Sequence, residues 1–234
     1  MGFNEAQTKA ICHKNGPAMV LAGPGSGKTL VITRRVEYLI KKYGVRPEQI
    51  LVITFTKAAA KEMRERFARI TKDDRFPVTF GTFHGIYYGI LKWAYRMNAS
   101  NIFSEEEKMM LLREVIAGME LEIEDEKEFL QGIASEIGQI KNNRLSLEEY
   151  ESSNCSDQMF RQIYEEYERR RKLLKKIDFD DMLVLCYELF QKRPDILQMW
   201  QKKFQYILID EFQDINQVQY DVIQIGRARV GKEC

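Results

Sequence analysis

The sequence has little of what metal sites and cross-linked folds require. Its few cysteines and histidines, among 234 residues, are Cys12, Cys155, Cys186, Cys234, His13 and His84. The cysteines lie far apart and none forms a C-x-x-C pair, which argues against a zinc site and a disulfide framework. Such cysteine usage is typical of the reducing cytoplasm, and we expect the protein there.

An excess of charge and long apolar runs are also missing. The 36 basic and 35 acidic residues leave a formal charge of +1, so any surface for a polyanion must be local. No run of apolar residues reaches the roughly 18 needed to span a membrane, and the first residues do not resemble a basic-then-apolar leader. We therefore expect no membrane association and no export.

Short apolar, β-branched runs alternate with longer helical patterns. The runs that predict buried strands are Ala18 to Leu21, Ile50 to Phe55, Val78 to Phe80 and Tyr206 to Ile209. Helices are predicted after the first three strands, from Lys28 to Tyr43, Lys57 to Ile70 and His84 to Tyr95. This order predicts an α/β fold with a mostly parallel sheet that is covered on both faces.

The middle of the chain has a different pattern. Residues 101–176 contain long charged helical stretches without strand signals, and capping boxes at Ser104 to Glu107 and Ser146 to Glu149 predict two helix starts. We interpret residues 101–176 as an inserted helical subdomain. The α/β domain would then be discontinuous, from residues 1–100 and 177–234, with a helix from near Asn216 and a polar, irregular end at 226–234.

A glycine-rich segment lies between a predicted strand and a predicted helix, where a phosphate-binding loop (P-loop) belongs. Its residues are Ala22, Gly23, Pro24, Gly25, Ser26, Gly27, Lys28 and Thr29. Small residues let backbone N–H groups surround a phosphate, while Lys28 would reach the β- and γ-phosphates and Thr29 would bind Mg²⁺. The alternative is a glycine-rich turn that binds nothing.

A P-loop needs an acid at the end of a neighbouring strand. Asp210 and Glu211 directly follow the predicted strand Tyr206 to Ile209. Asp210 would hold Mg²⁺, and Glu211 would act as the base that polarises the attacking water. The alternative is that the two acids only cap a helix. Together with Lys28, they predict catalysis of nucleotide hydrolysis.

The segment Asp210-Glu211-Phe212-Gln213-Asp214 resembles the Walker B motif of superfamily 1 DNA helicases of the UvrD/Rep/PcrA type. Phe3-Asn4-Glu5-Ala6-Gln7 resembles the Q motif of the same family. The resemblance implies a RecA-like P-loop domain, and it implies that Gln7 hydrogen-bonds adenine and that Gln213 belongs to the nucleotide site. It covers Phe3 to about Ile225.

Two further segments resemble the family's motifs Ia and Ib, which contact single-stranded DNA. The resemblance assigns that contact to Phe55, Thr56, Thr82, Phe83 and His84. Aromatic rings stack on bases of any sequence, and threonine hydroxyls can bind phosphates. The alternative is that these aromatic residues, with Tyr87 and Tyr88, belong to the core.

Some positions depart from the family or admit two interpretations. Leu30 stands where relatives often have an arginine, and Gly85 where a serine is common. The basic run from Arg169 to Lys172 could meet duplex DNA, but glutamates at helical spacing precede it, so a salt-bridged solvent face explains it equally well. Asp178-Phe179-Asp180-Asp181 resembles a segment that follows the family's helical insertion.

The resemblance implies ATP- and Mg²⁺-dependent 3′ to 5′ translocation on single-stranded DNA and unwinding at duplex junctions. No segment of this sequence resembles the family's second RecA-like domain. We therefore expect this chain alone to be a monomer that binds ATP and hydrolyses it very slowly. Three alternatives are a RecB/AddA-type nuclease-helicase subunit, a P-loop phosphotransferase with a helical lid, and a non-catalytic DNA-binding or scaffolding module with a vestigial P-loop.

Overall fold

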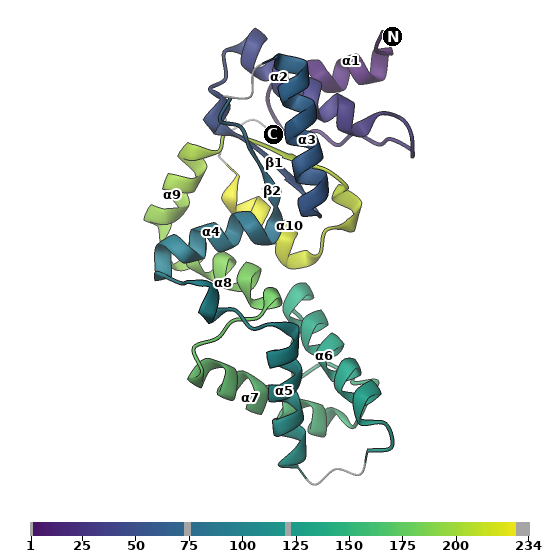
Figure 1. Cartoon of the computed structure of the whole chain (residues 1–234), viewed down its shortest axis with the longest axis vertical. Coiled ribbons are helices and arrows are strands. Elements are labelled where there is room, and N and C mark those ends of the chain that lie inside the picture. Colours follow the sequence, from purple (N-terminus) through teal and green to yellow (C-terminus); the bar gives the residue numbers. More distant parts are fainter. Residues whose placement is uncertain (1, 73–75, 120–122, 228–234) are drawn as a thin grey trace. The chain divides into compact units, whose positions relative to one another are not determined.

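A computed structural model describes residues 2–72, 76–119 and 123–227 (Figure 1). The described chain divides into two compact units. The first contains residues from 1–86, 190–215 and 223–234, and the second contains residues from 87–189 and 216–222. The polar end was predicted to begin at 226, but Gly226 is the last residue of the last helix, and residues 228–234 of that segment lie outside the described residues.

Helices make up most of the described structure. The α-helices are α1 (Glu5–Cys12), α2 (Lys28–Tyr43), α3 (Lys57–Thr71), α4 (Phe83–Tyr95), α5 (Glu105–Ala117), α6 (Glu126–Asn143), α7 (Asp157–Leu173), α8 (Phe179–Lys192), α9 (Pro194–Lys203) and α10 (Gln217–Gly226). The strands are β1 (Ile50–Thr54), β2 (Thr79–Thr82) and β3 (Tyr206–Ile209), and the 3₁₀ turns are η1 (Pro47–Gln49), η2 (Ala99–Asn101) and η3 (Phe212–Asp214).

The first unit is built on a small parallel sheet. Its strand order is β2-β1-β3, with Thr54 opposite Thr82 and Ile53 opposite Ile209. Every residue of β1 is buried, so both faces of the central strand are covered. Side chains of α2 and α3 pack with those of the strands into one core. The predicted α/β fold with a parallel sheet is therefore confirmed.

One predicted strand is wrong. The segment Ala18 to Leu21 lies outside the sheet, and Leu21 is 89% exposed. An apolar run forms a strand only when its backbone finds an edge to pair with, and within the described residues β3 pairs on its β1 side alone. The apolar composition of this segment predicted a buried strand, but its backbone is not paired into the sheet.

The second unit has a helical core of its own. Residues of α5, α6 and α7 form it, including Leu112, Ile137 and Phe160. As predicted, Ser104 caps α5: its hydroxyl accepts from the Glu107 N–H at 3.1 Å, and the Glu107 carboxylate accepts from the Ser104 N–H at 2.9 Å.

The second predicted capping box, at Ser146, is wrong, because residues 146–150 form no helix. The Arg161 guanidinium donates to the carbonyls of Leu147 at 3.2 Å and Glu148 at 2.7 Å. Those oxygens are the ones that a helix starting at Ser146 would need for its own i to i+4 bonds. The next helix begins instead after Ser156, whose hydroxyl accepts from the Met159 N–H.

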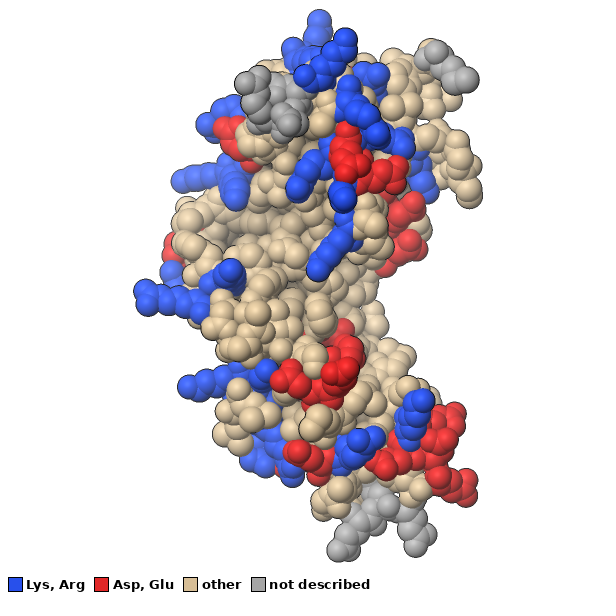
Figure 2. Space-filling model, in the orientation of Figure 1, with Lys and Arg blue, Asp and Glu red and all other residues tan. Residues whose placement is uncertain are grey.

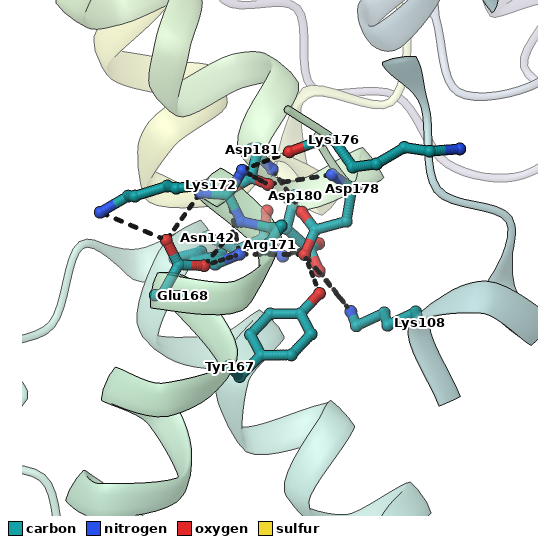
Figure 3. A network of polar contacts seen from close by, with 11 residues as sticks. Lys108, Asn142, Tyr167, Glu168, Arg171, Lys172, Lys176, Asp178, Asp180 and Asp181 are labelled. Atoms are coloured by element: carbon teal, nitrogen blue, oxygen red, sulfur yellow. Dashed lines mark hydrogen bonds and ion pairs between the residues drawn. The ribbon is translucent and has the colours of Figure 1, made fainter. Parts of the chain in front are cut away.

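A buried ionic cluster ties α5, α6, α7 and α8 together (Figure 3). Lys141 Nζ lies 2.9 Å from Asp178 Oδ2, 2.9 Å from Asp181 Oδ1 and 2.7 Å from Glu168 Oε1. Asp178 and Asp181 also accept each other's backbone N–H at the start of α8. The acidic segment that follows the predicted insertion therefore anchors α8 to its neighbours.

Charges of both signs are interspersed over the face shown in Figure 2, in keeping with the nearly neutral composition. The predicted basic run on α7 is largely engaged: Glu166 accepts from Arg169 and Arg170, and Glu168 accepts from Arg171. The salt-bridged interpretation of this run therefore fits the structure better than a free basic patch. None of the described helices is long and apolar enough to cross a bilayer.

Candidate functional site

The predicted P-loop forms an irregular turn that leads directly into α2. Gly25 and Gly27 have φ angles of +73° and +81°, which only glycine adopts without strain. Gly27 is the N-terminal cap residue of α2, and the Ser26 N–H donates to the Gly23 carbonyl at 3.3 Å. A turn of this kind at a helix N-terminus suits an anionic ligand, because backbone N–H groups and the helix dipole face it.

Lys28 and Glu211 meet although they are far apart in the sequence. Lys28 Nζ lies 3.0 Å from Glu211 Oε2, and the same oxygen accepts from Gln213 Nε2 at 2.7 Å. The structure therefore brings together the lysine, the predicted base and the glutamine that the sequence assigned to one nucleotide site. In the sequence, nothing except the motif that contains both residues indicated the direct contact of Gln213 with Glu211.

The two adjacent acids have opposite environments. Asp210 is almost fully buried, and this burial raises the pKa of its carboxyl group. The nearby negative charge of Glu211 raises it further. Hydrogen bonds from Gln213 and Lys28 lower the pKa of Glu211. Glu211 also has a φ angle of +53°, an uncommon conformation for a non-glycine residue and one that is enriched at functional sites. Spacing along the chain could not predict this turn.

The donor set suits a nucleotide with a magnesium ion. Thr29 lies in the first turn of α2, and the Asp210 N–H donates to the Ile53 carbonyl at 2.9 Å, which fixes Asp210 at the end of β3. Hydroxyl and carboxylate oxygens are ligands that Mg²⁺ prefers. The lysine, the threonine and the acid pair are therefore chemically compatible with Mg-ATP, and their roles stay predictions.

Gln7 lies against the P-loop. Its Nε2 donates to the Ser26 carbonyl at 3.0 Å, and its Oε1 accepts from the Asn4 N–H at 3.0 Å. Asn4 is the N-cap of α1, and its side chain accepts from the Gln7 N–H at 2.8 Å. Gln7, which is predicted to hydrogen-bond adenine, is thus hydrogen-bonded to the loop that is predicted to hold the phosphates.

The predicted DNA-contacting residues follow two neighbouring strands. Phe55 and Thr56 come directly after β1, and Phe83 and His84 come directly after Thr82 of β2. Because these strands are parallel and Thr54 pairs with Thr82, the residues emerge at the same edge of the sheet. Ligands of open α/β sheets bind at this edge.

The two rings at this edge differ in exposure. Phe55 is 36% exposed, whereas Phe83 is only 2% exposed, and their ring centroids lie 5.8 Å apart. The sequence assigned base stacking to both, but only Phe55 offers a ring to solvent in this conformation. Phe83 lies beneath it as a packing partner, and the buried Tyr87 likewise belongs to the core.

Both threonines at the edge use their hydroxyl oxygens as helix caps. Thr56 Oγ1 accepts from the Ala59 N–H at 3.0 Å, and Thr82 Oγ1 accepts from the Gly85 N–H at 3.2 Å. A hydroxyl that accepts can still donate its own hydrogen, so a phosphate contact remains compatible with capping. His84 is half-buried beside them.

Comparison with known proteins gives the family. A profile of the UvrD/REP helicase N-terminal domain matches residues 3–227. The chain is 41% identical over 232 residues to YjcD of Bacillus subtilis (strain 168), covering 96% of this chain and 30% of that protein. It is 34% identical over 239 residues to the ATP-dependent DNA helicase Rep of Escherichia coli (strain K12), covering 98% and 35%.

A third relative is the ATP-dependent DNA helicase PcrA of Leuconostoc citreum, 32% identical over 232 residues, with 96% of this chain and 31% of that protein covered. The chain thus spans about a third of the length of the curated relatives it matches. The family predicted from the P-loop, the acid pair and the Q motif is confirmed: the chain belongs to the UvrD/REP helicase N-terminal domain family.

Proposed function

We propose that this chain is the ATP-binding part of an ATP-dependent DNA helicase that moves 3′ to 5′ along single-stranded DNA. The contact between Lys28 and Glu211 carries the proposal, because it joins the phosphate loop to the acid pair across 183 residues of sequence. The relatives named as ATP-dependent DNA helicases support the reaction class.

Each residue of the nucleotide site has a distinct role in this proposal. The backbone of the turn from Ala22 to Gly27 binds phosphate oxygens, and Lys28 neutralises their charge. Thr29 and Asp210 would hold Mg²⁺, which supplies charge neutralisation at the phosphates when bound. Glu211, with its lowered pKa, is ionised and can accept a proton from a water.

Glu211 and Lys28 form an ion pair in this structure, so a bound nucleotide must displace Glu211 from Lys28. Phosphate oxygens then replace the carboxylate as the partner of Lys28. The exchange releases Glu211 to face a water, while Gln213 still donates to it and fixes its orientation. In this way binding of the substrate itself would prepare the base.

Single-stranded DNA would lie along the edge where β1 and β2 end. Phe55 presents a ring for base stacking, and the hydroxyls of Thr56 and Thr82 can donate to phosphates. These contacts do not depend on base identity, as a translocating motor requires. Unwinding at a duplex junction and a location in the cytoplasm are further parts of the proposal.

The proposal is tested on the whole protein that contains these residues. Its ATP hydrolysis should accelerate when single-stranded DNA is added, and Phe55→Ala should reduce that stimulation without changing the basal rate. A phosphate-release assay with and without an oligonucleotide measures both quantities. Equal rates with and without DNA would contradict a DNA motor and favour a phosphotransferase.

A further inference from the structure

The C-terminal end of α4 carries an exposed tryptophan. The chain has two tryptophans: Trp200 is only 7% exposed, whereas Trp93 is 60% exposed. Tyr95, the last residue of the same helix, is exposed as well. Tryptophan and tyrosine side chains are large and are mostly covered in folded proteins. Two exposed rings at one helix end indicate a surface that binds a partner.

The opposite face of α4 fixes this surface in the second unit. Tyr87 and Leu91 are fully buried, whereas Gly89, Lys92 and Trp93 are exposed. Residues four apart lie on the same face of a helix, so the buried pair and the exposed set lie on opposite sides. The indole of Trp93 is therefore presented from a packed helix and not from a loose loop.

The helix surface beside Trp93 is open. Helical side chains point back towards the preceding turn, and the residue one turn before Trp93 is Gly89. A Cβ added at Gly89 would meet no atom within 4 Å. A planar ligand can therefore approach the indole without displacing a side chain at that position.

The charge around these rings is positive. From Arg75 to Ser104 the chain contains no aspartate or glutamate, although 30% of its residues are charged. Lys92 and Arg96 flank Trp93 in the sequence, and both are exposed. Among the described residues neither forms an ion pair, in contrast to the arginines of α7. This helix end is thus a local source of positive charge in a chain that is nearly neutral as a whole.

The helix dipole does not account for this arrangement. Basic residues at a helix C-terminus interact favourably with the dipole, which explains a lysine or an arginine there. It does not explain why the ring between them is in water. Proteins bind single-stranded nucleic acid with this combination, because cations contact the phosphates while bases stack on aromatic rings.

We propose that Trp93, flanked by Lys92 and Arg96, is a stacking position for single-stranded DNA in addition to Phe55. It rests on the proposed binding of single-stranded DNA by this chain. One base stacks on the indole, and the two cations bind neighbouring phosphates. None of these contacts involves a base edge, so binding at this surface does not depend on sequence.

The two tryptophans allow this surface to be observed directly. When residues 1–234 are titrated with oligothymidylate, stacking on Trp93 should quench tryptophan fluorescence, while the buried Trp200 gives a constant background. Trp93→Phe should abolish the quenching but keep the affinity within about twofold, because a ring remains. Trp93→Ala should abolish the quenching and weaken binding by roughly five- to tenfold, the lower end of the range for one stacked base.

Met110→Ala is the matched control for these variants. Met110 lies in α5 of the same unit and is also 60% exposed, so its truncation should change neither the quenching nor the affinity. An affinity of Trp93→Ala for oligothymidylate equal to that of Met110→Ala would overturn the inference.

The salt dependence of binding tests the role of the charges. Lys92→Gln should make the slope of log affinity against log salt less steep by about 0.7, the contribution of one phosphate on a single strand. Lys127→Gln, which changes an exposed lysine of α6 in the same unit, should retain the slope of the unmodified chain. An unchanged slope in Lys92→Gln would contradict the phosphate contact.

Phe55→Ala separates this inference from the proposed function. It should weaken binding but retain the quenching at saturating oligothymidylate, because Trp93 is intact. Binding without quenching in the unmodified chain, or equal quenching by duplex DNA, whose bases are already stacked, would overturn the inference alone. A chain that binds no single-stranded DNA would contradict both the inference and the proposed DNA binding.

Discussion

Glu211 Oε2 is shared by two donors, Lys28 Nζ at 3.0 Å and Gln213 Nε2 at 2.7 Å. The carboxylate therefore competes with phosphate for the lysine that the phosphate loop supplies. Both partners of the ion pair are about one-third exposed, which limits the pair to about 0–1 kcal/mol. A nucleotide can therefore displace Glu211 from Lys28, and the effect of this competition on nucleotide affinity is large enough to measure.

Glu211→Gln should consequently tighten binding of Mg-ATP by up to about fivefold, because Lys28 is released from its carboxylate. Titration of residues 1–234 with a fluorescent ATP analogue measures the change. Glu62→Gln is the control, since it breaks the exposed pair of Glu62 with Arg66 elsewhere in the same unit. Weaker binding by Glu211→Gln would show that the glutamate assists the nucleotide rather than competing with it.

Phe55 and Phe83 should respond differently to truncation. Phe55→Ala should weaken single-stranded DNA binding by roughly 1–3 kcal/mol, the usual contribution of a stacked base. Phe83→Ala should instead destabilise the fold by about 3–5 kcal/mol, because its ring is buried. Fluorescence anisotropy with labelled oligonucleotides and urea unfolding measure the two effects. A loss of affinity confined to Phe83→Ala would contradict the assignment of stacking to Phe55.

The ionic cluster of the second unit should depend strongly on Lys141. Lys141→Met leaves Asp178, Asp181 and Glu168 without their shared cation, and removing one partner of a buried pair costs about 3–5 kcal/mol. Lys41→Met is the matched control, because the pair of Lys41 with Glu37 is exposed on its lysine side and worth about 0–1 kcal/mol. Urea midpoints should fall clearly for the first variant only. Equal midpoints would mean that the cluster contributes no net stability.

Asp181 should make the stability of this cluster depend on pH. Burial, with Asp178 nearby, raises the pKa of Asp181 to about 6 against the opposing effect of Lys141. Its unfolded value is about 3.9, so the folded state holds the proton more tightly. The resulting stabilisation is fully present below about pH 4 and is lost as the pH rises through about 6, with an upper bound of about 3 kcal/mol.

Unfolding free energies of the unmodified chain and of Asp181→Asn, measured by urea from pH 4 to pH 7, test this assignment. Asparagine cannot ionise, so the stability of the variant relative to the unmodified chain should rise over that interval. The opposite trend would show that Lys141 and Arg171 outweigh burial and keep Asp181 ionised.

Periodicity and local chemistry predicted much of this structure. The predicted bounds of α2 and β3 match the observed ones, because Gly27 and Gly44 mark the ends of the helix and the apolar run Tyr206 to Ile209 has a strand beside it. Ser104 predicted the start of α5 through a capping box that forms as expected. In these places local preference and tertiary environment agree.

The remaining differences arise from partners distant in sequence. Arg161 takes the carbonyls that a helix at Ser146 would need, and Ala18 to Leu21 pair with no strand among the residues that the structure describes. The family motifs assigned Phe55 and Phe83 the same role, but only packing decides which ring is covered. Lys28 and Gln213 both contact Glu211 because the folded chain brings Lys28 to Glu211. Their spacing in the sequence could not predict this contact.

We propose that the turn from Ala22 to Gly27, with Lys28, binds the phosphates of ATP. Thermal melting of residues 1–234 with and without Mg-ATP tests it most directly. At 100 times the dissociation constant, a ligand specific for the folded state adds about 2.7 kcal/mol, which corresponds to a melting shift of roughly 5–10 °C for a chain of this size. Lys28→Ala should remove most of that shift, whereas Lys41→Ala, a control at the far end of α2, should retain it. An equal shift in Lys28→Ala and the unmodified chain would contradict the account.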